Sequence, residues 1–252
     1  MERYSRQSAF SHIGREGQEK LLRSKVVVIG VGALGTVAAN NLARAGLGYI
    51  RMIDRDCVEL VNLHRQVLYD EDDAAQSLPK AIAAYNRLKR VNSEITLEPV
   101  IADVGASNIE GLISDMDLVL DATDNFQVRM VINEACFKHR IPWIYCGALE
   151  SLGTTMNILP DGDSPCLKCY FGESIPSSTE TCRTVGVLNM LTVTMASIQT
   201  AEAVKILLDS DSVRRELLFV DLWENRFDMI KIEKDKNCPV CARHEYEYLS
   251  SE

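Results

Sequence analysis

The chain of 252 residues lacks any run of about 18 apolar residues, the length that a transmembrane helix requires. It begins MERYSRQSAF, which contains arginines but no apolar segment behind them, as a secretory signal would need. We therefore expect neither membrane spanning nor secretion, and we predict a cytoplasmic protein.

An excess of basic residues is also missing, because 27 Lys and Arg stand against 36 Asp and Glu and the net charge is −9. Binding to nucleic acid depends mostly on cations that neutralise phosphates, so this balance argues against a nucleic-acid partner. Any phosphate that the protein binds must be held by a local group of residues.

Long polar or low-complexity stretches are absent as well, and hydrophobic residues make up 46% of the chain. This composition predicts one large α/β core, with disorder confined to the two ends. We expect a single domain over residues 1–252: an N-terminal arm and helix (1–24), a first half built from alternating strands and helices (25–150), and a second half with a crossover loop, a long helix and C-terminal strands (151–252).

Runs of β-branched residues alternate with helix-forming segments in the first half, which predicts a doubly wound, mostly parallel sheet. The expected strands are 25–29, 49–53, 95–100, 118–120 and 143–146, and the expected helices are 33–45, 79–91 and 125–139. After residue 147 the pattern predicts an antiparallel extension with strands at 154–159, 217–221 and 227–232 and a long helix at 187–208. The loop 161–184, between the expected strand 154–159 and the long helix, collects Gly, Pro, Ser and three cysteines, so it is a functional candidate.

Gly30, Gly32 and Gly35 form the pattern GxGxxG between the first expected strand and the first expected helix, and Asp54 ends the second strand. In this context the glycines allow a tight turn, a close approach of phosphate to the backbone, and close helix packing, while the acidic residue accepts from a ribose hydroxyl. The pattern indicates a Rossmann-like nucleotide site. Glycines that merely make a tight turn are the alternative.

Residues beyond this turn favour ATP over a dinucleotide. Asn62, Arg65 and Gln66 follow the second strand, and Lys80 opens the next helix. When a carboxylate attacks the α-phosphorus of ATP, negative charge grows on the departing pyrophosphate, and fixed cations stabilise it. Hydride transfer to NAD develops no such charge. Each residue taken alone would be an ordinary solvated side chain, so the prediction depends on their clustering.

Two carboxylates, Asp121 and Asp124, follow the fourth expected strand, where a doubly wound sheet places ligand contacts. We predict Asp124 as the better Mg²⁺ ligand. Its alternative role is to cap the helix that begins near Asn125.

Four of the eight cysteines form two CxxC pairs, Cys166 with Cys169 and Cys238 with Cys241, each in a turn-rich setting. Four thiolates suit a closed, tetrahedral, structural Zn²⁺ site. Redox disulfides or unliganded thiols are the alternatives. Of the other four cysteines, we interpret Cys57, Cys136 and Cys146 as packing residues and consider Cys182 separately below.

The motifs RYSRQ, GVGALG, DRDCVELVNLHRQ, LPK, LDATDN and TCRTVGV, together with the two CxxC pairs, occur in the order seen in the ThiF/MoeB family, and the resemblance spans nearly the whole chain. It implies that the chain adenylates the Gly-Gly terminus of a ubiquitin-like sulfur carrier. It further implies that Asp54 holds the ribose, that Asn62, Arg65 and Lys80 contact phosphates, and that Asp124 holds magnesium. SLPK in place of GQPK, and Val61 in place of serine, depart from the family pattern.

The resemblance also assigns two residues outside the nucleotide turn. Arg6 resembles an arginine that such proteins insert into the active site of the opposite protomer, which implies a homodimer. Cys182 matches a cysteine that links covalently to the carrier in the ThiF branch but is dispensable in the MoeB branch, so both roles stay open. A thiolate there would be favoured by Arg183 and the following helix N-terminus.

We therefore predict an ATP-dependent adenylyltransferase that uses Mg²⁺ and carries structural zinc. A separate persulfide donor is expected if sulfur is transferred, and the carrier's tail is expected to thread under the loop between Cys169 and Thr184. Rival functions are activation of a small molecule or a tRNA base on the same fold, an NAD(P)-dependent dehydrogenase, and a non-catalytic scaffold that binds a ubiquitin-like protein.

Overall fold

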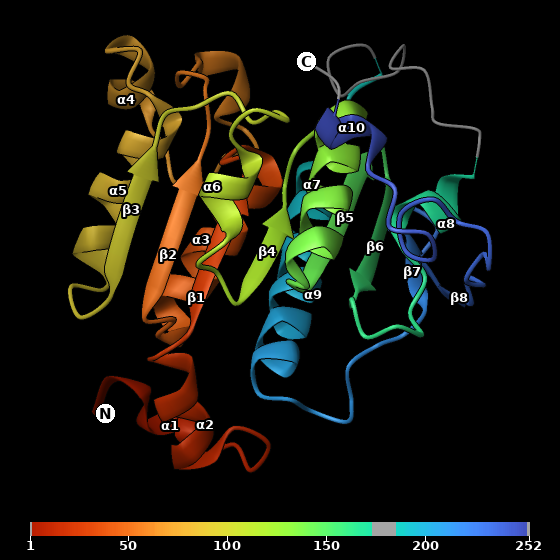
Figure 1. Cartoon of the computed structure of the whole chain (residues 1–252). Helices are drawn as coiled ribbons and strands as arrows, with labels where there is room; N and C mark the ends of the chain where they lie inside the picture. The colour runs from red at the N-terminus through yellow and green to blue at the C-terminus, as the bar shows by residue number, and fades with distance from the viewer. Residues whose placement is uncertain (1, 173–184, 251–252) are drawn as a thin grey trace.

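Eight strands form one sheet in the order β3-β2-β1-β4-β5-β6-β7-β8 (Figure 1). The computed structural model describes residues 2–172 and 185–250. The strands are β1 (Lys25–Ile29), β2 (Tyr49–Ile53), β3 (Thr96–Val100), β4 (Leu118–Asp121), β5 (Trp143–Leu149), β6 (Leu152–Ile158), β7 (Leu217–Asp221) and β8 (Arg226–Ile230). The pairs from β3 to β5 are parallel, and those from β5 to β8 are antiparallel. The predicted fold class is confirmed.

Helices cover both faces of this sheet in Figure 1, with α6 and α7 on the near face and α3 and α9 on the far face. The α-helices are α1 (Ser5–Ser8), α2 (Gly14–Leu21), α3 (Ala33–Ala45), α4 (Glu71–Ala75), α5 (Lys80–Val91), α6 (Ile109–Ile113), α7 (Phe126–His139), α8 (Leu167–Phe171), α9 (Asn189–Leu207) and α10 (Glu247–Ser250). Short 3₁₀ turns lie at η1 (Glu2–Tyr4) and η2 (Leu60–Asn62). Within the described ranges, no helix has the length and apolar character needed to cross a membrane.

Because helices cover both faces of the sheet, the central strands are apolar on both faces. Val26 to Ile29 in β1 are buried without alternation, because α3 covers one side and α7 the other. The small side chains of α3 allow close packing against the sheet and against α9. Gly46 ends α3 in the left-handed conformation (φ 81°), which turns the chain back into β2.

Most predicted boundaries match, and the differences have local causes. β5 continues to Leu149, three residues beyond the expected end, because it forms a hairpin with β6 around Glu150, whose φ is 51°. The last strand ends earlier than expected, at Ile230. The prediction that Cys57 packs in the core is wrong: it is exposed beyond the end of β2, whereas Cys136 and Cys146 are buried.

Candidate functional site

A cleft of about 570 Å³ opens at the carboxyl ends of the parallel strands. The chain passes from β1 to β2 and β3 on one side of β1, and then crosses to β4 on its other side. A doubly wound sheet places its ligand crevice where the strand order reverses in this way. The cleft is lined by eight of the residues predicted from sequence: Gly30, Gly32, Asp54, Asn62, Arg65, Gln66, Lys80 and Asp124. Segments far apart in the sequence therefore meet in one cavity.

The glycine turn has the backbone that the sequence predicted. Gly30 has a φ of 87°, and a Cβ atom there would lie 2.7 Å from the carbonyl oxygen of Ala122. A Cβ on Gly35 would lie 1.9 Å from the carbonyl oxygen of Gly30, so this glycine brings α3 close to the turn rather than lining the cleft. Gly32 is the N-cap of α3 and lines the cleft, and the first amides of a helix have no acceptor within it and can bind an anion.

Asp54 is fixed at the end of β2 by two backbone amides. Its Oδ2 accepts from the N–H of Val31 at 2.7 Å, and its Oδ1 accepts from the N–H of Asp56 at 2.8 Å. Burial raises the pKa of Asp54, while the nearby Lys80 cation and these two amides oppose the shift. Each carboxylate oxygen can accept a further hydrogen bond, so Asp54 retains the capacity to bind a ribose hydroxyl.

Two cations line the same cleft, Arg65 from the loop after η2 and Lys80 from the first turn of α5. The Nζ of Lys80 donates to Oδ2 of Asp56 at 3.0 Å, and this lysine side chain is only 7% exposed. Arg65 donates from one guanidinium nitrogen to Oδ1 of Asn62 at 2.8 Å. Gln66 is buried beside them, and its Oε1 has no hydrogen-bond partner among the described residues. The cations are thus held in place before any ligand arrives.

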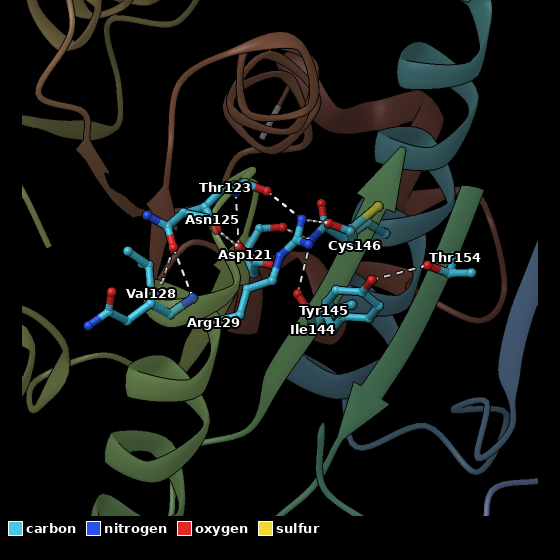
Figure 2. A network of polar contacts seen from close by, with 11 residues as sticks. Asp121, Thr123, Asn125, Val128, Arg129, Ile144, Tyr145, Cys146 and Thr154 are labelled. Atoms are coloured by element: carbon cyan, nitrogen blue, oxygen red, sulfur yellow. Dashed lines mark hydrogen bonds and ion pairs between the residues drawn. The ribbon is translucent and has the colours of Figure 1, made fainter. Parts of the chain in front are cut away.

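Asp121 and Asp124 occupy different environments, and Figure 2 shows the first of them. Asp121 is fully buried and accepts from the N–H and Oγ1 of Thr123 and from Nε of Arg129 at 3.0 Å. Asp124 is exposed on the rim of the cleft. The alternative that Asp124 caps α7 is wrong, because Asn125 is the cap: its Oδ1 accepts from the N–H groups of Gln127 and Val128.

Arg129 is a cleft residue that the sequence analysis missed. Besides its bond to Asp121, it donates to the carbonyl oxygens of Thr123 and Cys146, and its guanidinium lies 5.0 Å from the ring centre of Tyr145 (Figure 2). These contacts join β4, β5 and α7 beneath the cleft. An arginine among the apolar residues of α7, eight positions after a strand-terminal aspartate, was the available signal.

The four CxxC cysteines come together at a second site. The Sγ atoms of Cys166, Cys169, Cys238 and Cys241 all lie within 4.8 Å of one another. The Sγ atoms of Cys166 and Cys238 are 3.6 Å apart, and those of Cys169 and Cys241 are 3.4 Å apart. A tetrahedral ion with metal–sulfur bonds of about 2.3 Å requires sulfur separations of about 3.8 Å, so the arrangement fits a metal ion.

Comparison with known families decides the assignment, because the model of the ThiF family matches residues 4–240. The chain belongs to the ThiF family. The match covers both the cleft and the first three of the four clustered cysteines.

Relatives of this ThiF-family chain align along almost its whole length. It is 40% identical to a sulfur carrier protein ThiS adenylyltransferase of Bacillus subtilis (strain 168), over 99% of the chain and 74% of the relative. It is 38% identical to the SAMP-activating enzyme E1 of Haloferax volcanii, over 96% of the chain and 89% of the relative. The crystal structure of E. coli MccB with ATP shares the fold, with a TM-score of 0.82 at 22% identity, over 95% of this chain and 74% of that one.

Arg6, which the resemblance places in a ThiF-family active site, does not lie in the cleft of its own chain. Arg6 is an exposed residue of α1, which lies at the amino ends of the strands, opposite the cleft (Figure 1). Its predicted role in a partner's site stays a prediction. Cys182 lies outside the described residues, as does most of the crossover loop expected to cover the carrier's tail.

Proposed function

We propose that the chain transfers AMP from ATP to the C-terminal carboxylate of a small ubiquitin-like sulfur carrier protein that ends in Gly-Gly. The observation that carries this proposal is the joining, in one cleft, of the glycine turn with Asp54, the cations Arg65 and Lys80, and the exposed carboxylate of Asp124. The relatives whose names include carrier adenylation or activation support the class of substrate. We propose further that residues 1–252 act as one adenylation domain, since all eight strands form one sheet.

The reaction requires an in-line displacement at the α-phosphorus. A carboxylate oxygen of the carrier forms a bond to this phosphorus, the bond to the oxygen that bridges the α- and β-phosphates breaks, and pyrophosphate leaves with the electron pair. Arg65 and Lys80 would stabilise the charge that grows on the leaving group. Their prior contacts with Asn62 and Asp56 fix the two cations, so little reorganisation is needed when that charge develops.

Asp124 is the residue that we propose as the ligand of Mg²⁺. Its carboxylate is exposed on the cleft rim, whereas Asp121 is buried and already bonded to Thr123 and Arg129. Bound magnesium would neutralise charge on the phosphate oxygens. The position of Asp124 beyond the end of β4 directs its charge toward the opening rather than into the core.

Exchange of radioactive pyrophosphate into ATP tests this function. We expect exchange only with a carrier that retains its terminal Gly-Gly, and we expect Asp124→Ala to reduce the rate at least about 100-fold through lost stabilisation of phosphate charge. The matched control is Asp211→Ala, which removes an exposed carboxylate from the loop before β7 and should leave the rate unchanged. If ATP binds but no carrier supports exchange, the acceptor is a small molecule or an RNA instead.

For the cysteine centre we propose Zn²⁺, because four thiolates leave no open coordination position. Its role would be to hold the C-terminal segment to α8. Reduced thiols of this kind persist in the cytosol, which is where we place the protein.

We also propose a homodimer in which Arg6 completes the partner's cleft, since α1 of the same chain lies at the other end of the sheet. Arg6→Ala and Asp124→Ala should each be inactive alone. An equal mixture allowed to exchange subunits should regain about a quarter of the wild-type exchange rate, because half of the dimers then contain one intact site. No recovery after verified subunit exchange would show that Arg6 does not act across the interface.

After adenylation, a sulfur atom, either the terminal sulfur of a donor's persulfide or the thiolate of Cys182, would form a bond to the carrier's carbonyl carbon, and AMP would leave as the bond to its phosphate oxygen breaks. The second route predicts a covalent complex of carrier and enzyme that Cys182→Ser abolishes, detectable as a mass shift in intact-protein mass spectrometry.

A further inference from the structure

Part of the cleft is lined by residues at and just beyond the carboxyl ends of the neighbouring strands β2 and β3, and we call this part the slot. Its apolar walls are Ile53, Ala102 and Val104, and its polar residues are Arg55 and Asp103. If phosphates bind at the glycine turn and the ribose at Asp54, the base must extend away from the turn, toward this slot. An apolar slot with two charged groups at its edge suits a flat heterocycle.

Arg55 and Asp103 form an ion pair across this part of the cleft. One guanidinium nitrogen of Arg55 donates to Oδ2 of Asp103 at 2.8 Å, so the pair links the loop after β2 to the loop after β3. The Arg55 side chain is 60% exposed and the Asp103 side chain 68% exposed. Such exposed pairs add little to the stability of a fold, so stability does not account for their place at the slot.

We propose that this pair selects the base of the nucleotide, with Asp103 accepting from the exocyclic amino group of adenine and Arg55 stacking on the ring. The proposal rests on the function proposed above, since it needs a nucleoside triphosphate whose ribose lies at Asp54. A carboxylate is only an acceptor, so it pairs with the amino group at position 6 of adenine and repels the carbonyl oxygen that guanine and hypoxanthine carry there. The guanidinium can stack on any base, so Arg55 should not discriminate between adenine and a base with a carbonyl oxygen at position 6.

Calorimetric titration with ATP and with ITP, its 6-oxo analogue, separates these two roles. We expect the wild-type protein to bind ATP at least about tenfold more tightly than ITP, as one charge-assisted hydrogen bond implies. In Asp103→Asn the difference should fall below about threefold, because an amide can both donate and accept. In Arg55→Met the affinity for both nucleotides should fall by a similar factor of about ten.

Matched controls come from Arg15 and Glu19, an exposed ion pair within α2. Glu19→Gln and Arg15→Met should leave the affinity for both nucleotides unchanged. Equal affinity of the wild-type protein for ATP and ITP, or a full preference for ATP in Asp103→Asn, would overturn the proposal.

The two proposals fail in different ways. Loss of base preference in Asp103→Asn, together with no carrier-dependent exchange in the wild-type protein, would retain the role of the pair and remove the proposed function. Carrier-dependent exchange together with an unchanged base preference in Asp103→Asn would retain the proposed function and remove the role of the pair.

Discussion

Replacing Arg129 with leucine should lower the free energy of unfolding by about 3–5 kcal/mol, because it leaves Asp121 buried without a counter-charge. The two side chains are 6% and 0% exposed, and Arg129 also donates to the carbonyl oxygens of Thr123 and Cys146. Chemical denaturation followed by circular dichroism measures the change. Pyrophosphate exchange should fall as well, since these contacts hold the loop after β4 that carries Asp124.

The pH dependence of this loss gives a more specific readout. Burial raises the pKa of Asp121, and in the native protein the Arg129 cation opposes this rise. Without that cation, the folded-state pKa of Asp121 should lie further above its unfolded value. Folding then favours the protonated acid, so the stability of the variant should decrease as pH rises from below about 4 through the raised pKa. The difference between wild type and variant should therefore be larger at pH 8 than at pH 5.

A double variant separates the charge from the packing. Arg129→Leu combined with Asp121→Asn removes both charges and should recover part of the lost stability, and its stability relative to wild type should vary less with pH. If the single and double variants were equally stable at every pH, the ion pair would have no part in holding these strands and α7 together.

Local patterns were sufficient to predict the first β-α-β unit. The β-branched run 25–29, the alanine-rich segment 33–45 and the strand 49–53 have the predicted bounds, because periodicity and glycine punctuation agree there. The cleft residues Gly30, Asp54 and Asp124 could be predicted because each follows a parallel strand, and the ends of adjacent parallel strands meet at one edge of the sheet.

Features that depend on side-chain direction could not be predicted in this way. Arg129 is the inward-facing partner of Asp121, but a linear sequence does not show which face of α7 meets β4. Asn125 rather than Asp124 caps α7, a shift of one residue that decides which side chain is available to a ligand. Arg55 and Asp103 pair across two loops 48 positions apart, and only the adjacency of β2 and β3 brings them together.

Removing the metal from the cysteine centre should lower the midpoint of thermal unfolding by about 8–16 °C. A ligand at 1,000 times its dissociation constant stabilises the native state by about 4 kcal/mol, and each kcal/mol corresponds to about 2–4 °C for a chain of this size. Calorimetry before and after treatment with a chelator, with the zinc content measured on the same samples, tests this expectation. Restoring zinc should restore the midpoint.

The contacts around the centre indicate which part of the chain should loosen first. On one side, Asn133 of α7 accepts from the N–H of Leu167, next to Cys166. On the other, the buried Glu134 accepts from the N–H groups of Glu247 and Leu249 in α10. After β8, the segment 231–250 forms no further strand, so the centre and α10 are its main attachments to the core.

Limited proteolysis should therefore cut between residues 231 and 250 sooner in the metal-free protein than in the zinc-bound protein, before the parallel sheet is attacked. Cys166→Ser should reproduce this pattern, whereas Cys57→Ser, which removes an exposed thiol outside the centre, should leave both the zinc content and the cutting rate unchanged. A Cys166→Ser protein with full zinc content and an unchanged cutting rate would contradict the assignment. No residue of the segment 231–250 lines the cleft, so ATP binding should persist at temperatures below the lowered midpoint.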